Sequence, residues 1–185
     1  MKLLSLIFLV FALFFSTGKI SGQTNSDGVT LNIRFRPVQT ITIQPSQKSI
    51  DINYSTQEDY NNGVSVTLDD HVSVFSSSGF QVKVEAGSDN FDNAGGATTI
   101  PVSDVVVNAS AGSGNHNSNI YNSVPLSTMP EPLITSANGG RGLNYSVTYD
   151  NSAAGSAGAY EGNYATSGND ETVYNAEITY SITPN

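Results

Sequence analysis

The sequence predicts an all-β protein, an immunoglobulin-like antiparallel β-sandwich of about eight to ten strands, with a closed β-barrel as the alternative architecture. Apolar and polar residues alternate with a period of two over most of the chain, as in strands with one buried and one wet face. Clusters of Gly, Asn and Ser separate these segments and indicate turns. No ten-residue window carries the apolar stripe and caps of a helix.

The first 22 residues have the pattern of a secretory signal peptide. Lys2 supplies a positive charge, residues 3–15 form an almost wholly apolar run, and small polar residues follow. Because the run is too short to span a bilayer comfortably, we expect it to be removed, with cleavage before Gln23 or alternatively near Gly18. Residues 23–185 would then form a single sandwich domain that is secreted or held at the cell surface.

Alternation predicts strands along the rest of the chain. In residues 80–86 every second side chain is apolar, and residues 174–182 show the longest run of the same pattern. Two stretches rich in Gly, Ser and Asn, residues 111–123 and 151–170, are interpreted as functional or mobile loops. In chain order, the predicted strands cover residues 31–36, 40–43, 50–54, 64–68, 71–76, 80–86, 98–100, 105–109, 132–136, 143–149 and 174–182.

Composition excludes several classes of function. The chain has no cysteine, which rules out disulfides, thiolate metal sites, a cysteine nucleophile and the lipid anchor of a bacterial lipoprotein. Removal of Lys2 and Lys19 with the signal peptide leaves five basic residues beside sixteen acidic ones, a formal net charge of −11. Such a surface repels nucleic acid and anionic membranes, so we expect neither as a partner.

Three blocks of sequence, residues 31–43, 59–84 and 173–183, carry a resemblance. Together they resemble the small secreted β-sandwich proteins of Bacteroidetes-type bacteria and, more distantly, the pilin-like and spore-coat-U-like surface subunits of Gram-negative bacteria. The resemblance implies an envelope or surface location and a structural or adhesive role. The chain lacks the disulfide of many pilins and ends in a full-length strand that chaperone–usher pilins lack, so no functional residue is transferred.

The histidines give little indication of catalysis. His71 follows an Asp-Asp pair, and a Ser–His–Asp arrangement with Ser73 or Ser76 is conceivable, but no Gly-x-Ser-x-Gly motif accompanies it. We interpret His71 as a strand-edge histidine with a local hydrogen bond to an aspartate. His116, in a polar loop, is expected to be exposed. We therefore assign no catalytic residue and predict a protein that is not an enzyme.

One acidic turn is a candidate calcium site. Carboxylate and amide oxygens are the ligands that Ca²⁺ prefers, although the spacing here does not match an EF-hand. An ordinary acidic hairpin turn is the alternative interpretation, and we expect no other cofactor. The candidate ligands are Asp89, Asn90, Asp92 and Asn93.

Tyrosines in polar loops are candidates for sugar binding, because exposed aromatic rings form platforms for sugars. Tyr160 and Tyr164 are the main candidates, with Tyr60 and Tyr121 beside them. The alternative is that these rings hold the loops against the sandwich. Alternation places the other tyrosines that we considered on core faces: Tyr54, Tyr145, Tyr149, Tyr174 and Tyr180.

The leading hypothesis is a non-enzymatic structural or adhesive protein of the cell surface or envelope, whose partners are copies of itself or other protein subunits. It would act by edge-strand pairing, through the N-terminal segment 31–43 or the C-terminal strand 172–183. The alternative is a secreted carbohydrate-binding module that uses loop tyrosines. A hydrolase dependent on His71 ranks third.

Overall fold

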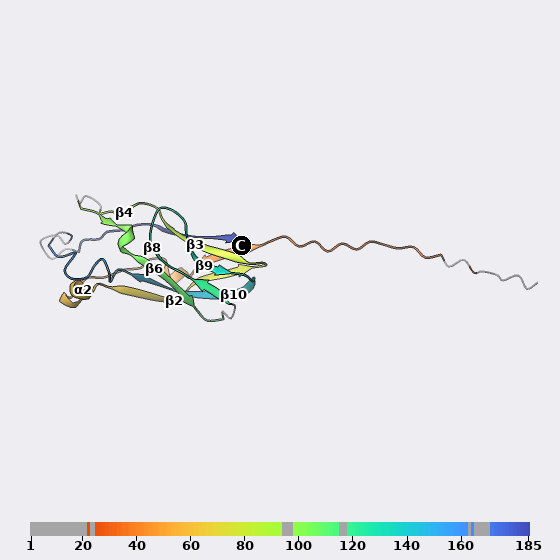
Figure 1. Ribbon diagram of the computed structural model, residues 1–185, viewed down its shortest axis with the longest axis horizontal. Helices are drawn as coiled ribbons and strands as arrows, with labels where there is room; N and C mark the ends of the chain where they lie inside the picture. Colours follow the sequence, from red (N-terminus) through yellow and green to blue (C-terminus); the bar gives the residue numbers. More distant parts are fainter. Residues whose placement is uncertain (1–21, 23–24, 94–97, 115–117, 163, 165–170) are drawn as a thin grey trace, which may run out of the picture. The chain divides into compact units, whose positions relative to one another are not determined.

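The computed structural model describes residues 22, 25–93, 98–114, 118–162, 164 and 171–185. The chain divides into two units, Met1–Phe35 and Arg36–Asn185. The described residues of the first unit carry no helix or strand, and the second unit is an all-β antiparallel sandwich (Figure 1). Within the described ranges, no helix has the length and apolarity needed to cross a membrane.

Two antiparallel sheets form the sandwich. Among the described residues each sheet begins and ends with an edge strand, so the two sheets stay separate and do not close into the alternative barrel. A third, two-stranded ladder joins β4 (Asn90–Phe91) to β5 (Ile100–Pro101). The five-stranded sheet has the order β1 (Gln39–Ile43), β2 (Ser65–Ser76), β10 (Gly140–Asp150), β6 (Val106–Ala111), β8 (Ser123–Pro125), and the four-stranded sheet has the order β11 (Ile178–Pro184), β3 (Phe80–Ala86), β9 (Glu131–Ser136), β7 (Asn119–Tyr121).

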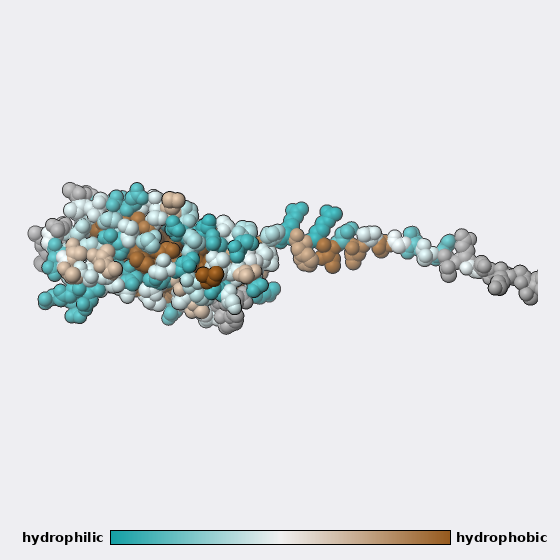
Figure 2. Space-filling view, viewed as in Figure 1, coloured by the Kyte–Doolittle hydropathy of each residue, from teal (hydrophilic) through white to brown (hydrophobic). Residues whose placement is uncertain are grey.

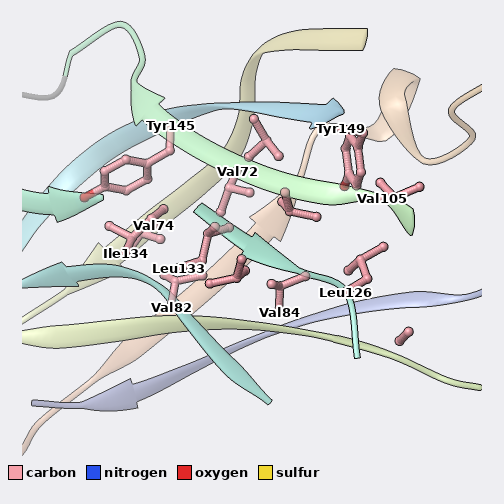
Figure 3. Packing of buried hydrophobic residues seen from close by; sticks show 14 of the residues in the cluster. Val72, Val74, Val82, Val84, Val105, Leu126, Leu133, Ile134, Tyr145 and Tyr149 are labelled. Atoms are coloured by element: carbon pink, nitrogen blue, oxygen red, sulfur yellow. The ribbon is translucent and has the colours of Figure 1, made fainter. Parts of the chain in front are cut away.

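The core lies between the two sheets and follows from the alternation. Along β3 the apolar positions are buried, and the polar positions between them are partly exposed. Figure 3 shows the apolar side chains of β2 and β10, among them Val72 and Tyr145, in one layer with those of β3 and β9, among them Val82, Val84 and Leu133. Branched side chains fill this layer, as the pleated surface of a half-buried strand favours.

In the described part of the chain, three short helices connect the strands: a 3₁₀ turn at Pro45–Gln47, the helix α2 at Gln57–Asn62 and a 3₁₀ turn at Val102–Asp104. The Thr56 hydroxyl accepts a hydrogen bond from the Asp59 N–H, and the Asp59 carboxylate accepts one from the Thr56 N–H, which forms a capping box at the start of α2. Helix α2 was not predicted, because six residues are too few to show an apolar stripe.

Several strand predictions are wrong in their bounds. Residues 31–36 and 50–54 are not strands, although Ile50 and Ile52 still pack against the core. The stretch 111–123, which we interpreted as a loop, contains β7 and the start of β8. Alternation predicts which side chains can face a core. A strand also needs a hydrogen-bonded neighbouring strand, and alternation does not predict that neighbour.

The predicted strands 64–68 and 71–76 are one strand, β2, with an irregularity between them. Asp70 has a φ of +52° there, and the pairing of β2 with β10 shifts register at the same place. The Asp70 carboxylate accepts hydrogen bonds from the backbone N–H of Ser113, at 2.6 Å, and from the Ser113 hydroxyl. These bonds hold the bulge in place, and they lower the pKa of Asp70.

Candidate assembly interface

The N-terminal segment, residues 29–35, exposes a row of large apolar side chains. Figure 1 draws it as an extended trace, and Figure 2 shows hydrophobic side chains along one edge of it and hydrophilic ones along the other. A contiguous row of exposed apolar side chains is a candidate interaction surface. Its members occupy alternate positions and are 74–94 % exposed: Val29, Leu31, Ile33 and Phe35.

The sandwich has two long open edges, and they lie side by side. Strands β1 and β11 end their respective sheets and contact each other. The opposite edges are β8 and β7, which have only three residues each. An added strand of seven residues therefore finds a matching length only along β11, which has seven residues, or in part along β1, which has five.

The open edge of β11 presents the backbone groups of residues that face the core. The Glu177 carbonyl accepts from the Gly87 N–H, and the Asn185 N–H donates to the Gly79 carbonyl, so odd-numbered residues here turn their backbone groups toward β3. Successive residues of a strand turn these groups opposite ways. The N–H and C=O groups of Ile178, Tyr180 and Ile182 therefore point to the open edge.

The core is incompletely covered along this edge. We call the five side chains there the β1–β11 seam; they pack against the core but are only partly buried, unlike the side chains of β3 and β9. A strand with an apolar face, added beside β11, would cover them. The seam consists of Ile41, Ile43, Ile178, Tyr180 and Ile182.

A buried polar cluster lies beneath the seam and includes the candidate catalytic histidine. His71 is 2 % exposed. Its Nδ1 lies 3.0 Å from Gln47 Oε1, its Nε2 lies 3.1 Å from the Tyr149 hydroxyl, and that hydroxyl lies 2.6 Å from the hydroxyl of Tyr180. The interpretation of His71 as an edge histidine bonded to an aspartate is wrong, because its partners are glutamine and tyrosine.

The electrostatics of this cluster favour neutral groups. Burial lowers the pKa of His71, and burial raises the pKa of Tyr149 to about 12. Burial also raises the pKa of Tyr180, and the neighbouring Tyr149 adds to this effect. Among the hydrogen bonds of the described residues, none joins His71 to Ser73 or Ser76. His116 lies outside the described residues.

The acidic turn is tied into the fold by hydrogen bonds. The Asp89 carboxylate accepts from the Thr128 hydroxyl at 3.1 Å, Asn90 belongs to β4, and Asp92 exchanges two backbone hydrogen bonds of 3.0 Å with Asn175. Within the part of the chain that the structure describes, no group of three or more His, Cys, Asp or Glu side chains could hold a metal ion. Calcium binding at this turn stays a prediction.

The two candidate sugar-binding tyrosines differ in exposure. Tyr160 is 8 % exposed; its hydroxyl donates to Asp104 Oδ2 at 2.9 Å and accepts from Asn151 Nδ2 at 3.0 Å. Its ring centroid lies 5.4 Å from that of Tyr54 and 5.1 Å from that of Tyr164, and burial raises the pKa of Tyr160. Tyr160 therefore anchors its loop to the sandwich, Tyr164 is partly exposed, and sugar binding by the pair stays a prediction.

The sequence alone predicts part of this candidate interface. The candidate pairing segment began at Leu31 and so missed Val29, although the alternation extends back through Thr30. It named the C-terminal strand but could not show that β1 lies beside it, because that proximity depends on how the sheets pack. No protein-family model matches this chain and no curated protein matches it, so its function has to be argued from this geometry.

Proposed function

We propose that this protein is an exported, non-enzymatic structural or adhesive component of the cell surface or envelope. It acts by protein–protein contact, and the N-terminal segment adds as a strand to the open sheet edge of a partner. The observation that carries the proposal is the exposed apolar row of residues 29–35.

The chemistry of the segment suits strand addition. Its alternation gives one apolar face for a partner's core and one polar face for solvent. In this mode of recognition the main-chain hydrogen bonds contribute affinity, and the alternate side chains contribute specificity. In an exposed extended segment the backbone groups bond to water, whereas a sheet edge offers half of them protein partners.

Export is supported by the signal-peptide pattern of the first 22 residues. The assignment of no catalytic role to His71 is supported by its surroundings, since it is 2 % exposed and its ring nitrogens lie against Gln47 and Tyr149. Antibody labelling of intact cells tests the location: we expect surface labelling, and labelling only after the cells are lysed would contradict it.

The function itself is tested by removing the segment. The exported chain and a variant lacking residues 25–35 are compared by size-exclusion chromatography with light scattering over a range of concentrations, and by negative-stain microscopy. We expect the full chain to form dimers or longer assemblies and the deletion variant to stay monomeric with an unchanged β-type circular dichroism spectrum. A full chain that stays monomeric at high concentration, or a deletion variant that assembles equally well, overturns the proposal.

A further inference from the structure

We infer that the partner is a second copy of this chain and that the acceptor is the open edge of its β11. The donated segment runs antiparallel to β11, in the register that sets Leu31 opposite Tyr180 and Ile33 opposite Ile178. This inference rests on the proposed function and specifies the partner, the edge and the register.

Hydrogen bonding and side-chain direction agree in this register. In an antiparallel pair, two residues that exchange both backbone hydrogen bonds have their side chains on the same face. The residues of β11 that offer N–H and C=O groups at the edge also face the core. The donor residues opposite them must therefore be the apolar ones, none of which is proline. A shift of one residue would turn the whole apolar row to solvent.

Proline sets a limit to the pairing. Pro37 continues the alternate positions of the apolar row, so pairing that extended to it would need its N–H to donate a hydrogen bond to the β11 edge. Proline has no N–H and cannot make that bond. The register given above ends at Phe35, opposite Ala176, which lies two residues before the start of β11, and it leaves Pro37 beyond the last pair. All four apolar donor residues then lie opposite apolar residues, from Val29 with Ile182 to Phe35 with Ala176.

Charge selects the antiparallel direction. In the antiparallel register, Arg34 lies opposite Glu177, and both residues are exposed on the polar face. Opposite charges directly across a strand pair stabilise it. A parallel arrangement would instead set Arg34 beside the uncharged polar side chains of β11, which are Thr179, Ser181 and Thr183.

Charge also favours a copy of this chain as the partner. The segment and the two residues after it contain Arg34 and Arg36 and no acidic residue, whereas residues 39–185 contain three basic and fifteen acidic residues. The donor is thus basic and the sandwich strongly acidic, which is complementary between copies. Since donor and acceptor are different surfaces, the contact is head-to-tail and can propagate into a filament.

Engineered cysteines test the register directly, because the chain has none of its own. In the proposed register Asn32 and Thr179 form a non-hydrogen-bonded pair, for which the Cα separation is about 4.5 Å. A disulfide accepts Cα separations of about 4.4–6.8 Å. An Asn32→Cys chain is mixed with a larger, tagged Thr179→Cys chain and mildly oxidised, and the mixed disulfide is measured by non-reducing electrophoresis.

Two control variants of the acceptor chain test which edge strand is used and in which register. Thr40→Cys places the thiol on β1, and Ser181→Cys places it two residues along β11. We expect at least ten-fold more mixed disulfide with Thr179→Cys than with either control. A preference for Thr40→Cys overturns the choice of β11, and an equal or higher yield with Ser181→Cys overturns the register.

A chain that carries both Asn32→Cys and Thr179→Cys distinguishes pairing within one copy from pairing between two copies. Closure of its disulfide within a monomer, with no product in the mixing experiment, overturns the choice of a second copy. A full chain that assembles through residues 25–35 but gives no mixed disulfide with any acceptor overturns this inference and leaves the proposed function standing. A full chain that never assembles overturns both.

Discussion

A single buried amide connects three distant segments of the sandwich. Asn151 is almost fully buried at the end of β10. Its Oδ1 accepts from the Tyr54 hydroxyl, and its Nδ2 donates to the Asp104 carbonyl and the Tyr160 hydroxyl, each at 3.0 Å. Every polar atom of the side chain has a partner, which a buried amide requires. The sequence contains no pattern that marks this asparagine among the many others.

We predict that Asn151→Ala destabilises the protein by about 3 kcal/mol, because it leaves buried hydroxyl and carbonyl groups without partners. Urea unfolding at neutral pH measures the loss. Asn175→Ala is the matched control, since Asn175 is exposed and pairs through its backbone, and we expect a change below about 0.5 kcal/mol. Equal losses in the two variants would contradict the connecting role of Asn151.

His71 makes stability depend on pH. Its pKa in the folded protein is lowered by burial, so the unfolded chain binds the proton more readily. The stabilising contribution is present above the unfolded pKa of about 6.5 and is lost as the pH falls through the lower, folded pKa. We predict that the free energy of unfolding falls between about pH 7.5 and about pH 5.5, and that His71→Gln removes most of this slope. An unchanged slope in His71→Gln would contradict the assignment.

The elements could be predicted where alternation and pairing coincide. Strands β3 and β9 were predicted within a residue of their bounds, because their apolar faces are buried and both have partners on each side. Residues 31–36 alternate as regularly but pair with no strand among the described residues, so the same pattern gave a wrong strand. The irregularity at Asp70 and the proximity of β1 to β11 depend on contacts between distant residues, which local patterns do not contain.

The open edge should also affect how strongly side-chain truncations lower the free energy of unfolding. Leu133, on β9, is fully buried, whereas Ile182, on the edge strand β11, is only partly buried. We predict that Leu133→Ala costs about 3 kcal/mol and Ile182→Ala about 1 kcal/mol in dilute, unassembled protein, because truncation costs scale with the burial lost. Urea unfolding at low protein concentration measures both. Similar costs at the two positions would mean that β11 is already covered.

The charge distribution bears on how whole molecules associate. A basic segment and an acidic sandwich attract one another, and dissolved salt screens that attraction. We predict that association between chains is slower and weaker in about 0.5 M than in about 0.05 M NaCl, and that Arg34→Gln reduces this dependence. Light scattering after dilution from a dissociating solution follows the rate. Association that strengthens equally with salt in both chains would indicate an interface governed by apolar burial alone.

A matched pair of variants tests whether the apolar row of the N-terminal segment mediates assembly. Ile33→Asp places a carboxylate on the apolar row, and Asn32→Asp places one on the adjoining polar face; both positions are exposed, so neither change should affect folding. Mass is measured by light scattering across a concentration series. We predict that Ile33→Asp stays monomeric while Asn32→Asp assembles like the unmodified chain. Equal assembly by the two variants would contradict it.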